Sequence, residues 1–293
     1  MSRPGQSRWV RVVAHAFVGL MVLITLYPLL WVVSIAFSGN QSLAIVDLPP
    51  DATKLDRLRA IIPWPATWSS QNFVSVMSDQ PFAKWMLNSA LVAAGTTVVG
   101  VFLACTAAYA FSRLSFPGRR AGMLSFLISQ MFPGTLMLIP LYIMLVQWLN
   151  LGSSRLGLIL AYATTSIPFS VWMLKGYFDT IPKDLEEAAL MEGASVGQIF
   201  WTVIIPLARP ALAVTALFSF MSAWNEFILA ATFMDQETMY TAPVGLRFFV
   251  GGFSQQWGYF AAGSIIVSLP VTVLFLFLQR FLVSGLTAGS VKG

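Results

Sequence analysis

Residues 185–206 have the sequence LEEAALMEGASVGQIFWTVIIP and lie between two long apolar runs. The segment begins with acidic and small residues. Pro182, just before it, suits the first turn of a helix, and negative charge in that turn complements the helix dipole. Gly193 permits a break in the helix. We therefore predict a short polar helix from about residue 183 to 193, followed by an amphipathic stretch that ends at Pro206.

The composition places the flanking apolar runs in a membrane. Hydrophobic residues make up 57% of the chain, charged residues make up 10%, and the mean hydropathy is +0.75. Ordinary soluble domains contain roughly 25% charged residues. A soluble fold of this size could not bury so much apolar surface. The sequence therefore predicts an all-α fold, a polytopic bundle of transmembrane helices.

The apolar windows give the number of spans. A helix needs roughly 20 apolar residues to cross a bilayer, and about six windows meet that length. They are residues 12–37, 85–112, 123–148, 157–178, 210–233 and 258–283. The first window follows three arginines, as in a secretory signal, but it is far longer than a signal's apolar region of roughly 7–15 residues. We expect it to be retained as the first span.

Lysine and arginine residues predict the orientation of the spans. With the N-terminus in the cytoplasm, most of the 17 Lys and Arg residues fall on the inner side, and the short loop 113–120 is rich in arginine. Both termini are then cytoplasmic, as is the segment 179–209. That segment is the one inner segment with an acidic excess. The rule that predicts orientation counts only Lys and Arg, so it does not explain these acids. The outer segments are 38–84 and 234–257.

Several kinds of chemistry are absent from the sequence. No lysine is followed by Ser or Thr, which excludes a phosphate-binding loop of the G-x-x-x-x-G-K-[ST] type. The single histidine, His15, and the single cysteine, Cys105, cannot form a metal site, a catalytic constellation or an intrachain disulfide. The net charge of +5 does not indicate nucleic-acid binding, because basic residues in a membrane protein mainly set the orientation of its spans. We expect no catalytic residue, no bound cofactor or metal, and no nucleic-acid partner.

The polar segment resembles a motif of one transporter family. Glu187-Ala188-Ala189, three further residues, Gly193, nine further residues and then Val203-Ile204-Ile205-Pro206 resemble the "EAA" loop of ABC-importer permeases. The chain has Val203 where the motif has Ile, and Ile205 where it has Leu. Both changes conserve apolar character.

The resemblance covers nearly the whole chain. The stretches YAFSRLSFPG (109–118), QMFP (130–133), KGYF (175–178) and GLTAGSVKG (285–293) are similar to those of permeases of the maltose type. The resemblance implies a type I ABC importer permease fold in a bacterial cytoplasmic (inner) membrane. Residues 1–11 would be a cytoplasmic N-terminus, residues 12–293 one permease domain, and residues 284–293 its cytoplasmic tail.

The resemblance also implies roles for particular residues. In that family the EAA helix seats in a cleft of an ATPase subunit and transmits its closure to the membrane. Docking is thereby implied for Glu186, Glu187, Ala188, Ala189, Gly193, Ala194 and Pro206. The tail residues Thr287, Gly289 and Lys292 would contact the same ATPase. The outer residues Gly251, Gly252 and Phe253 would contact a sugar-binding protein.

The partners follow from the same resemblance. One chain with about six spans supplies half of such an importer, so a second permease subunit, identical or different, is expected. An ATPase dimer that binds ATP and Mg²⁺, an extracytoplasmic sugar-binding protein and membrane lipid complete the set. The imported carbohydrate could be maltose, maltodextrin or trehalose. The chain would not be an enzyme, because ATP hydrolysis would occur in the separate ATPase.

An acid within an apolar window is a further candidate. Asn225 and Glu226 lie in the fifth window, and an ionisable group in a span is a functional-site hypothesis by default. The two residues could line a polar path and accept hydrogen bonds from sugar hydroxyls. The alternatives are a structural acid that is hydrogen-bonded to a neighbouring helix, or an acid that already lies at the outer interface.

Two other functions are compatible with a membrane protein. An ion-gradient-driven secondary sugar carrier is the first, but such carriers typically contain inverted repeats and intramembrane coupling residues, and this sequence shows neither a repeat nor a coupling cluster. A scaffold that transports nothing is the second, and it would not explain a docking helix with this spacing. Uptake that requires ATP and survives an uncoupler would separate the importer from the carrier.

Overall fold

The structure is a computed structural model, and it describes residues 8–45, 48, 52–65, 67–252 and 255–289, with side chains from 280 onward left out. All regular secondary structure in these residues is helical, which confirms the predicted class. The chain divides into two compact units. We call them the N-terminal unit (Met1–Phe82 with Leu246–Val267) and the bundle unit (Ala83–Gly245 with Ser268–Gly293).

Within the described residues, four helices are long and apolar enough to cross a membrane. They are α1 (Arg8–Ala36), α4 (Phe82–Arg113), α7 (Arg155–Phe178) and the Trp257–Gln279 part of α14 (Trp257–Gly289). Two further spans are possible if each of two bent helix pairs crosses as one. Four to six spans agree with the expected number.

The third predicted window is not one straight helix, and this corrects the sequence prediction. It contains α5 (Arg119–Met131) and a following helical segment, η1 (Gly134–Met137), α6 (Leu138–Leu141) and η2 (Tyr142–Trp148), which are bent by 102°. The bend lies at Phe132, whose backbone is extended. The cause is Pro133, which disfavours helical geometry in the residue before it.

The fifth window is interrupted at Glu226, and a bend of the chain precedes it. The chain turns by 79° between the segment that ends at α10 (Ile205–Leu207) and α11 (Arg209–Asn225). Helix α11 then stops at Asn225, before α12 (Ile228–Phe233), because the backbone of Glu226 is extended. The break therefore falls on the acid that the sequence places inside a span.

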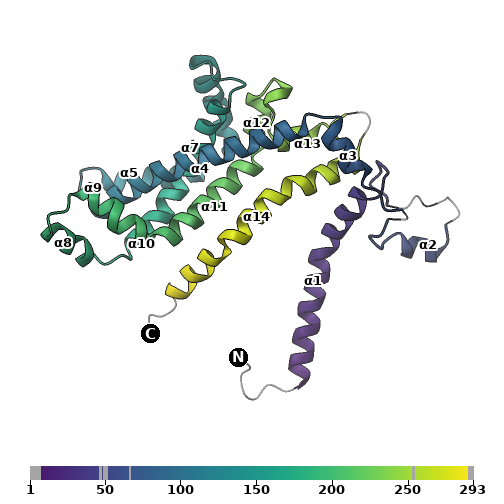
Figure 1. Cartoon of the computed structure of the whole chain (residues 1–293), viewed down its shortest axis with the longest axis horizontal. Coiled ribbons are helices and arrows are strands. Elements are labelled where there is room, and N and C mark those ends of the chain that lie inside the picture. The colour runs from purple at the N-terminus through teal and green to yellow at the C-terminus, as the bar shows by residue number, and fades with distance from the viewer. Residues whose placement is uncertain (1–7, 46–47, 49–51, 66, 253–254, 290–293) are drawn as a thin grey trace. The chain divides into compact units, whose positions relative to one another are not determined.

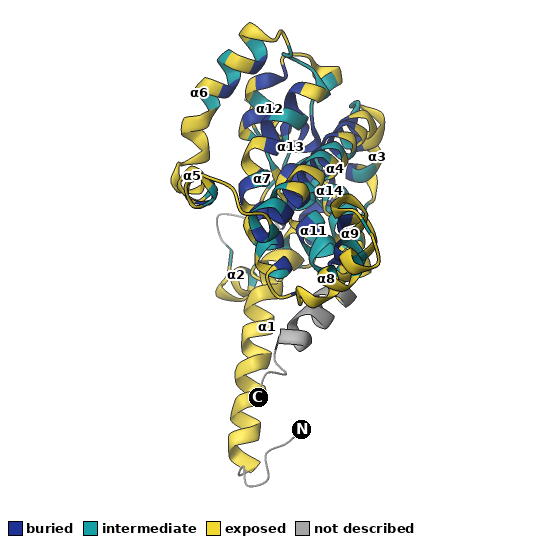
Figure 2. Cartoon of the chain, turned by 90° about the vertical axis from the view of Figure 1, so that its left-hand side faces the viewer, coloured by how far each residue is buried: buried dark blue, intermediate teal, exposed yellow. Residues whose placement is uncertain are grey.

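The N-terminal unit contains α1, α2 (Lys54–Arg59), α3 (Gln71–Ser78) and the start of α14. Buried Asn72 joins its segments: its side-chain amide donates to the carbonyl of Ala36 at 3.0 Å and accepts from Gln41 at 2.7 Å. The side chain of Gln41 in turn accepts from the backbone N–H of Tyr259 at 3.2 Å. Helix α1 is exposed along most of its length (Figure 2), so its apolar side chains must meet lipid or another subunit.

The bundle unit is built on α4, α7 and α11, with α5 beside α7. At the end where α4 and α7 finish and α11 begins, Figure 1 shows α8 (Asp184–Met191) and α9 (Val196–Ile199). The π-helical turn η3 (Phe200–Ile204) and α10 return the chain to the bundle. The other short helices of this unit are α12, η4 (Glu237–Met239) and α13 (Ala242–Arg247), whose last two residues belong to the N-terminal unit.

Candidate functional site

Helix α8 is the polar helix that the sequence predicts. It is shorter than expected by one residue at its start and by two residues at its end. Its first turn contains three acids, Asp184, Glu186 and Glu187, which the positive end of the helix dipole favours. Gly193, just after it, has a φ of +88°, and no atom beyond its chain neighbours lies within 4 Å of the position that a Cβ would occupy. Glycine is therefore needed there for the left-handed backbone rather than for space.

The inner side of α8 is bonded to α4. Glu186 accepts a hydrogen bond from the guanidinium Nε of Arg113, and the two side chains are only 12% and 7% exposed. The Tyr109 hydroxyl donates to the other carboxylate oxygen at 3.3 Å, and Arg113 also donates to the carbonyl of Ile181 at 2.9 Å. Glu186 therefore fastens α8 to the bundle.

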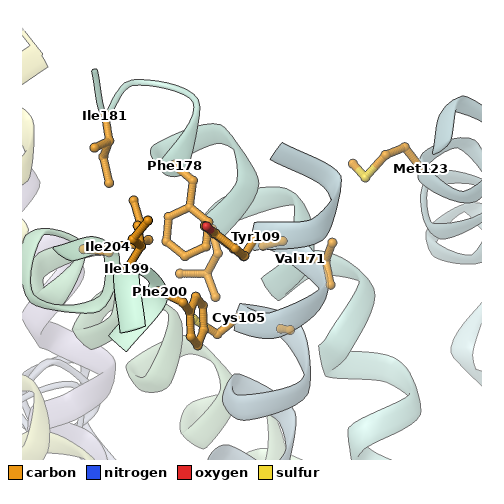
Figure 3. Close-up of a cluster of buried hydrophobic side chains, with 13 residues drawn as sticks. Cys105, Tyr109, Met123, Val171, Phe178, Ile181, Ile199, Phe200 and Ile204 are labelled. Atoms are coloured by element: carbon orange, nitrogen blue, oxygen red, sulfur yellow. The ribbon is translucent and has the colours of Figure 1, made fainter. Parts of the chain in front are cut away.

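A buried apolar cluster completes this attachment (Figure 3). The rings of Tyr109 and Phe178 lie beside Ile199, Phe200 and Ile204, which come from α9 and η3. The Tyr109 and Phe200 rings are 5.1 Å apart between centroids. Because α4, α7, α9 and η3 share this core, a force applied to the α8–α9 segment would reach the spans through it.

The outer side of α8 is free of such contacts. Among the predicted docking residues, the structure places Glu187, Ala188 and Gly193 on the exposed side, next to Met191, which is 89% exposed. Ala189 and Ala194 pack against the buried cluster instead. Pro206 lies half-buried in α10, away from that exposed side. Sequence reasoning missed the exposed apolar residues Leu190 and Met191, although apolar residues in an exposed polar helix were a detectable signal.

A second ion pair lies at the C-terminal end of α7, just before the α8 segment. Asp179 accepts from the ammonium of Lys175 at 2.6 Å and from the hydroxyl of Ser112 at 2.6 Å. Burial alone would raise the pKa of Asp179, but the bonds from Lys175 and Ser112 outweigh it and hold the pKa below its ordinary value. The carboxylate therefore stays charged where α4 and α7 meet the α8 segment.

Glu226 lies at the break between α11 and α12. Its two carboxylate oxygens accept from the backbone N–H groups of Leu229 at 2.9 Å and Ala230 at 3.1 Å, so it caps α12. The Asn225 amide donates to the carbonyl of Met221 in its own helix. These bonds correspond to the structural acid that the sequence left as an alternative. Any contact of this pair with a substrate stays a prediction.

A cavity of about 340 Å³ lies between α5, α7 and α11. Its lining is neutral and consists of five hydroxyls, one amide and two aromatic rings: Gln130, Thr165, Ser166, Phe169, Ser170, Phe218, Ser219 and Ser222. The two rings meet edge to face, with centroids 6.0 Å apart. Ser219 is 3% exposed, and its hydroxyl has no hydrogen-bond partner among the described residues.

Sequence reasoning missed this cavity. Its serines recur at helical spacing, Ser166 with Ser170 and Ser219 with Ser222, so each pair lies on one face of an apolar helix. That spacing was a usable signal. What the sequence could not give is that α5, α7 and α11 bring the two pairs together.

The remaining predicted sites are only partly described. Gly251 and Gly252 are exposed in a turn after α13, and the position of a Cβ on Gly251 is 2.9 Å from the carbonyl of Arg247. Phe253 and Lys292 lie outside the described residues. Thr287 and Gly289 belong to the last turns of α14, where side chains are not described. No metal-binding group of three or more His, Cys, Asp or Glu occurs in the described part of the chain.

Comparisons with known families give a consistent match. Residues 96–287 match the family described as "Binding-protein-dependent transport system inner membrane component". The chain is 34% identical to the inner membrane ABC transporter permease YcjP of Escherichia coli, over 97% of each chain. It is 37% identical to the maltose/maltodextrin permease MalG of Vibrio vulnificus, over 99% of this chain and 98% of MalG. It is 36% identical to the trehalose permease SugB of Mycobacterium tuberculosis, over 94% and 95%.

Solved structures agree on the fold. One chain of a bacterial ABC transporter that imports the acidic polysaccharide alginate matches with a TM-score of 0.77. The match covers 95% of this chain and 99% of that one, at 23% identity. The polytopic permease fold that the sequence predicts is therefore the one observed.

Proposed function

The chain belongs to the inner membrane components of binding-protein-dependent transport systems, and on that premise we propose that it forms half of the path of an ATP-driven importer of neutral oligosaccharides. It is a multi-pass permease subunit of the inner membrane and has no catalytic role of its own. The substrate, the partners and the coupling helix are the proposed parts.

The serine-lined cavity between α5, α7 and α11 carries the choice of substrate. A sugar presents hydroxyls that need hydrogen-bond partners and apolar ring faces that pack on aromatic rings. The lining supplies both, and the buried hydroxyl of Ser219 has an unused hydrogen-bonding capacity that costs free energy until a ligand or water meets it. The lining has no cation to balance an acidic sugar, so a neutral sugar such as the maltodextrins or trehalose of the named relatives fits it better than alginate.

The exposed side of α8 supports coupling to a separate ATPase. Glu187, Ala188 and Gly193 would seat in its cleft, with the exposed Met191 as an apolar contact. Glu186, Ala189 and Ala194 would act indirectly by keeping α8 attached to α4 and the buried cluster. Closure of an ATPase dimer would then move α8, α9 and the adjoining spans together.

The proposed assembly contains a second permease subunit, two ATPase subunits that hold ATP and Mg²⁺, and an extracytoplasmic binding protein. Both termini and the α8 segment lie in the cytoplasm. The tail residues Thr287, Gly289 and Lys292 reach the ATPase, and the turn at Gly251 and Gly252 with Phe253 faces the binding protein. Glu226 contributes to the path mainly by fixing the start of α12, and Asn225 bonds to the last turn of α11 beside it.

The test is uptake by the complete complex, reconstituted with its binding protein in vesicles. Ser219→Ala removes the unpartnered hydroxyl at little cost in volume. One hydrogen bond made only during passage is worth about 0.5–1.5 kcal/mol, so maximal uptake of a maltodextrin should fall about two- to tenfold. The half-saturating sugar concentration should not change, because the binding protein sets it.

Thr215→Val is the matched control. Thr215 is a buried hydroxyl residue one helical turn away on α11, it bonds to its own helix at the carbonyl of Ala211, and it does not line the cavity. Its uptake should equal that of the unmodified chain. Uptake that an uncoupler stops and ATP does not sustain would instead favour an ion-driven carrier. Equal uptake with Ser219→Ala, or faster uptake of an acidic oligosaccharide, would contradict the assigned substrate.

A further inference from the structure

A second cavity, of about 580 Å³, lies where α5 begins and α7 ends. It is distinct from the serine-lined cavity, because the two share no lining residue. Three cationic residues line it, Arg119, Arg120 and Lys175, and no acid does. Its chemistry therefore suits an anion.

The positive charge of this cavity is only partly balanced. Lys175 is paired with Asp179 at 2.6 Å. Arg119 donates to the backbone carbonyl of Ser112 at 3.3 Å, and no carboxylate pairs with its charge in the part of the chain that the structure describes. The described residues contain no ion pair for Arg120, and Glu186 nearby in the fold is already paired with Arg113. Two guanidinium groups therefore remain for a ligand.

The other side of the cavity is apolar. Phe116, Met123 and Trp172 line it, and Trp172 is 42% exposed. A freely soluble phosphate gains nothing from such a wall, whereas a lipid presents a phosphate next to hydrocarbon. Tryptophan is also enriched at the membrane–water interface, where these ends of α5 and α7 would lie.

We propose that this cavity binds an anionic phospholipid, with the phosphate held by Arg119, Arg120 and Lys175 and the glycerol and upper acyl carbons against Trp172 and Phe116. Basic pockets between transmembrane helices are suited to anionic head groups. The proposal is independent of the transported sugar, because no residue of the sugar cavity takes part.

The position of the cavity links lipid binding to α8. Lys175 contacts the cavity and bonds to Asp179, which also holds Ser112 next to Arg113. A lipid phosphate would compete with Asp179 for Lys175. Binding would therefore alter the contacts of Asp179, which precedes α8, while the Arg113–Glu186 pair stays in place.

The test counts lipids on the purified complete complex by native mass spectrometry. The complex is titrated with phosphatidylglycerol and, separately, with phosphatidylcholine of the same acyl chains. We expect one phosphatidylglycerol per copy of this chain to survive where phosphatidylcholine is lost. Equal retention of both lipids by the unmodified complex would overturn the proposal without any variant.

The variants locate the site. In the double variant Arg119→Gln/Arg120→Gln, affinity for phosphatidylglycerol should fall at least about tenfold, because two charge-assisted contacts are lost. Arg209→Gln is the matched control, since Arg209 is an exposed cation at the same end of the bundle unit and lies outside the cavity. Unchanged lipid retention in the double variant would contradict the site.

A further arm separates lipid from free anion. Inorganic phosphate at millimolar concentration should not displace phosphatidylglycerol, and displacement would identify the cavity as a soluble-phosphate site instead. The spectrum also reports subunit stoichiometry, so a variant that fails to assemble is recognised directly. Because mass alone is counted, failure of sugar uptake would refute the proposed substrate and leave the lipid result standing.

Discussion

Two acids of the bundle unit invite comparison: Glu186 lies in the polar segment, whereas Glu226 lies within an apolar window. In the structure both face inward, but they bind different things. Glu186 is paired with the cation of Arg113 on α4, whereas Glu226 accepts from two backbone N–H groups of α12. One acid therefore fixes a helix to a neighbour, and the other fixes where a helix begins.

The largest effect is expected from the ion pair between Arg113 and Glu186, which joins α4 to α8. Arg113→Met removes the partner of a largely buried carboxylate, and leaving such a charge unpaired costs about 3–5 kcal/mol. The change should lower the stability of the complex and expose α8 to protease. Adding Glu186→Leu should restore most of the loss, since no charge is then left unpaired. A double-mutant cycle that shows no coupling between the two residues would contradict the claim that this pair attaches α8 to α4.

Gly193 tests the exposed side of α8. Gly193→Trp places a bulky ring on that side and adds strain of about 1–2 kcal/mol from the left-handed backbone. We expect ATP hydrolysis to continue without transport while the subunit stays in the membrane. Gly193→Asn is the control, because Asn tolerates this conformation and is small. Normal transport by the tryptophan variant would count against docking on this side.

A substitution of Glu226 tests the cap of α12, and a smaller effect is expected. Glu226→Gln keeps one acceptor oxygen for the N-terminus of α12, so it should cost about 0.5–2 kcal/mol of stability, as for loss of a cap. Uptake of different sugars should fall by the same factor. A loss confined to one sugar, with stability unchanged, would return Glu226 to the substrate path.

Asp179 gives the smallest effect, and it depends on pH. Because its folded pKa lies below the ordinary value, its bonds to Lys175 and Ser112 stabilise the fold above about pH 4, the unfolded range for Asp, and this contribution is lost as the pH falls through the folded pKa. The side chain is 43% exposed, so solvent screening keeps the contribution under about 1 kcal/mol. Unfolding measured from pH 6 to pH 3 should show this slope in the unmodified complex and lack it in Asp179→Asn.

Local sequence signals predicted much of this molecule. Pro182 and the acids after it located α8, and apolar length located the straight spans. The bend after Phe132 follows from Pro133 and was within reach of the same reasoning. The orientation of Glu186 was not, because its partner Arg113 lies 73 residues earlier and faces it only after α4 and α8 pack together. The serine-lined cavity has the same cause, since three separate segments build it.

The central claim is that the exposed side of α8 faces the cytoplasm and an ATPase. A cysteine introduced as Glu192→Cys provides the most direct measurement, because position 192 is exposed and Cys105, the one native cysteine, is buried. A membrane-impermeant maleimide should leave it unlabelled in intact cells and label it in inverted vesicles, with less labelling when the ATPase is bound. Labelling from outside intact cells would contradict the account.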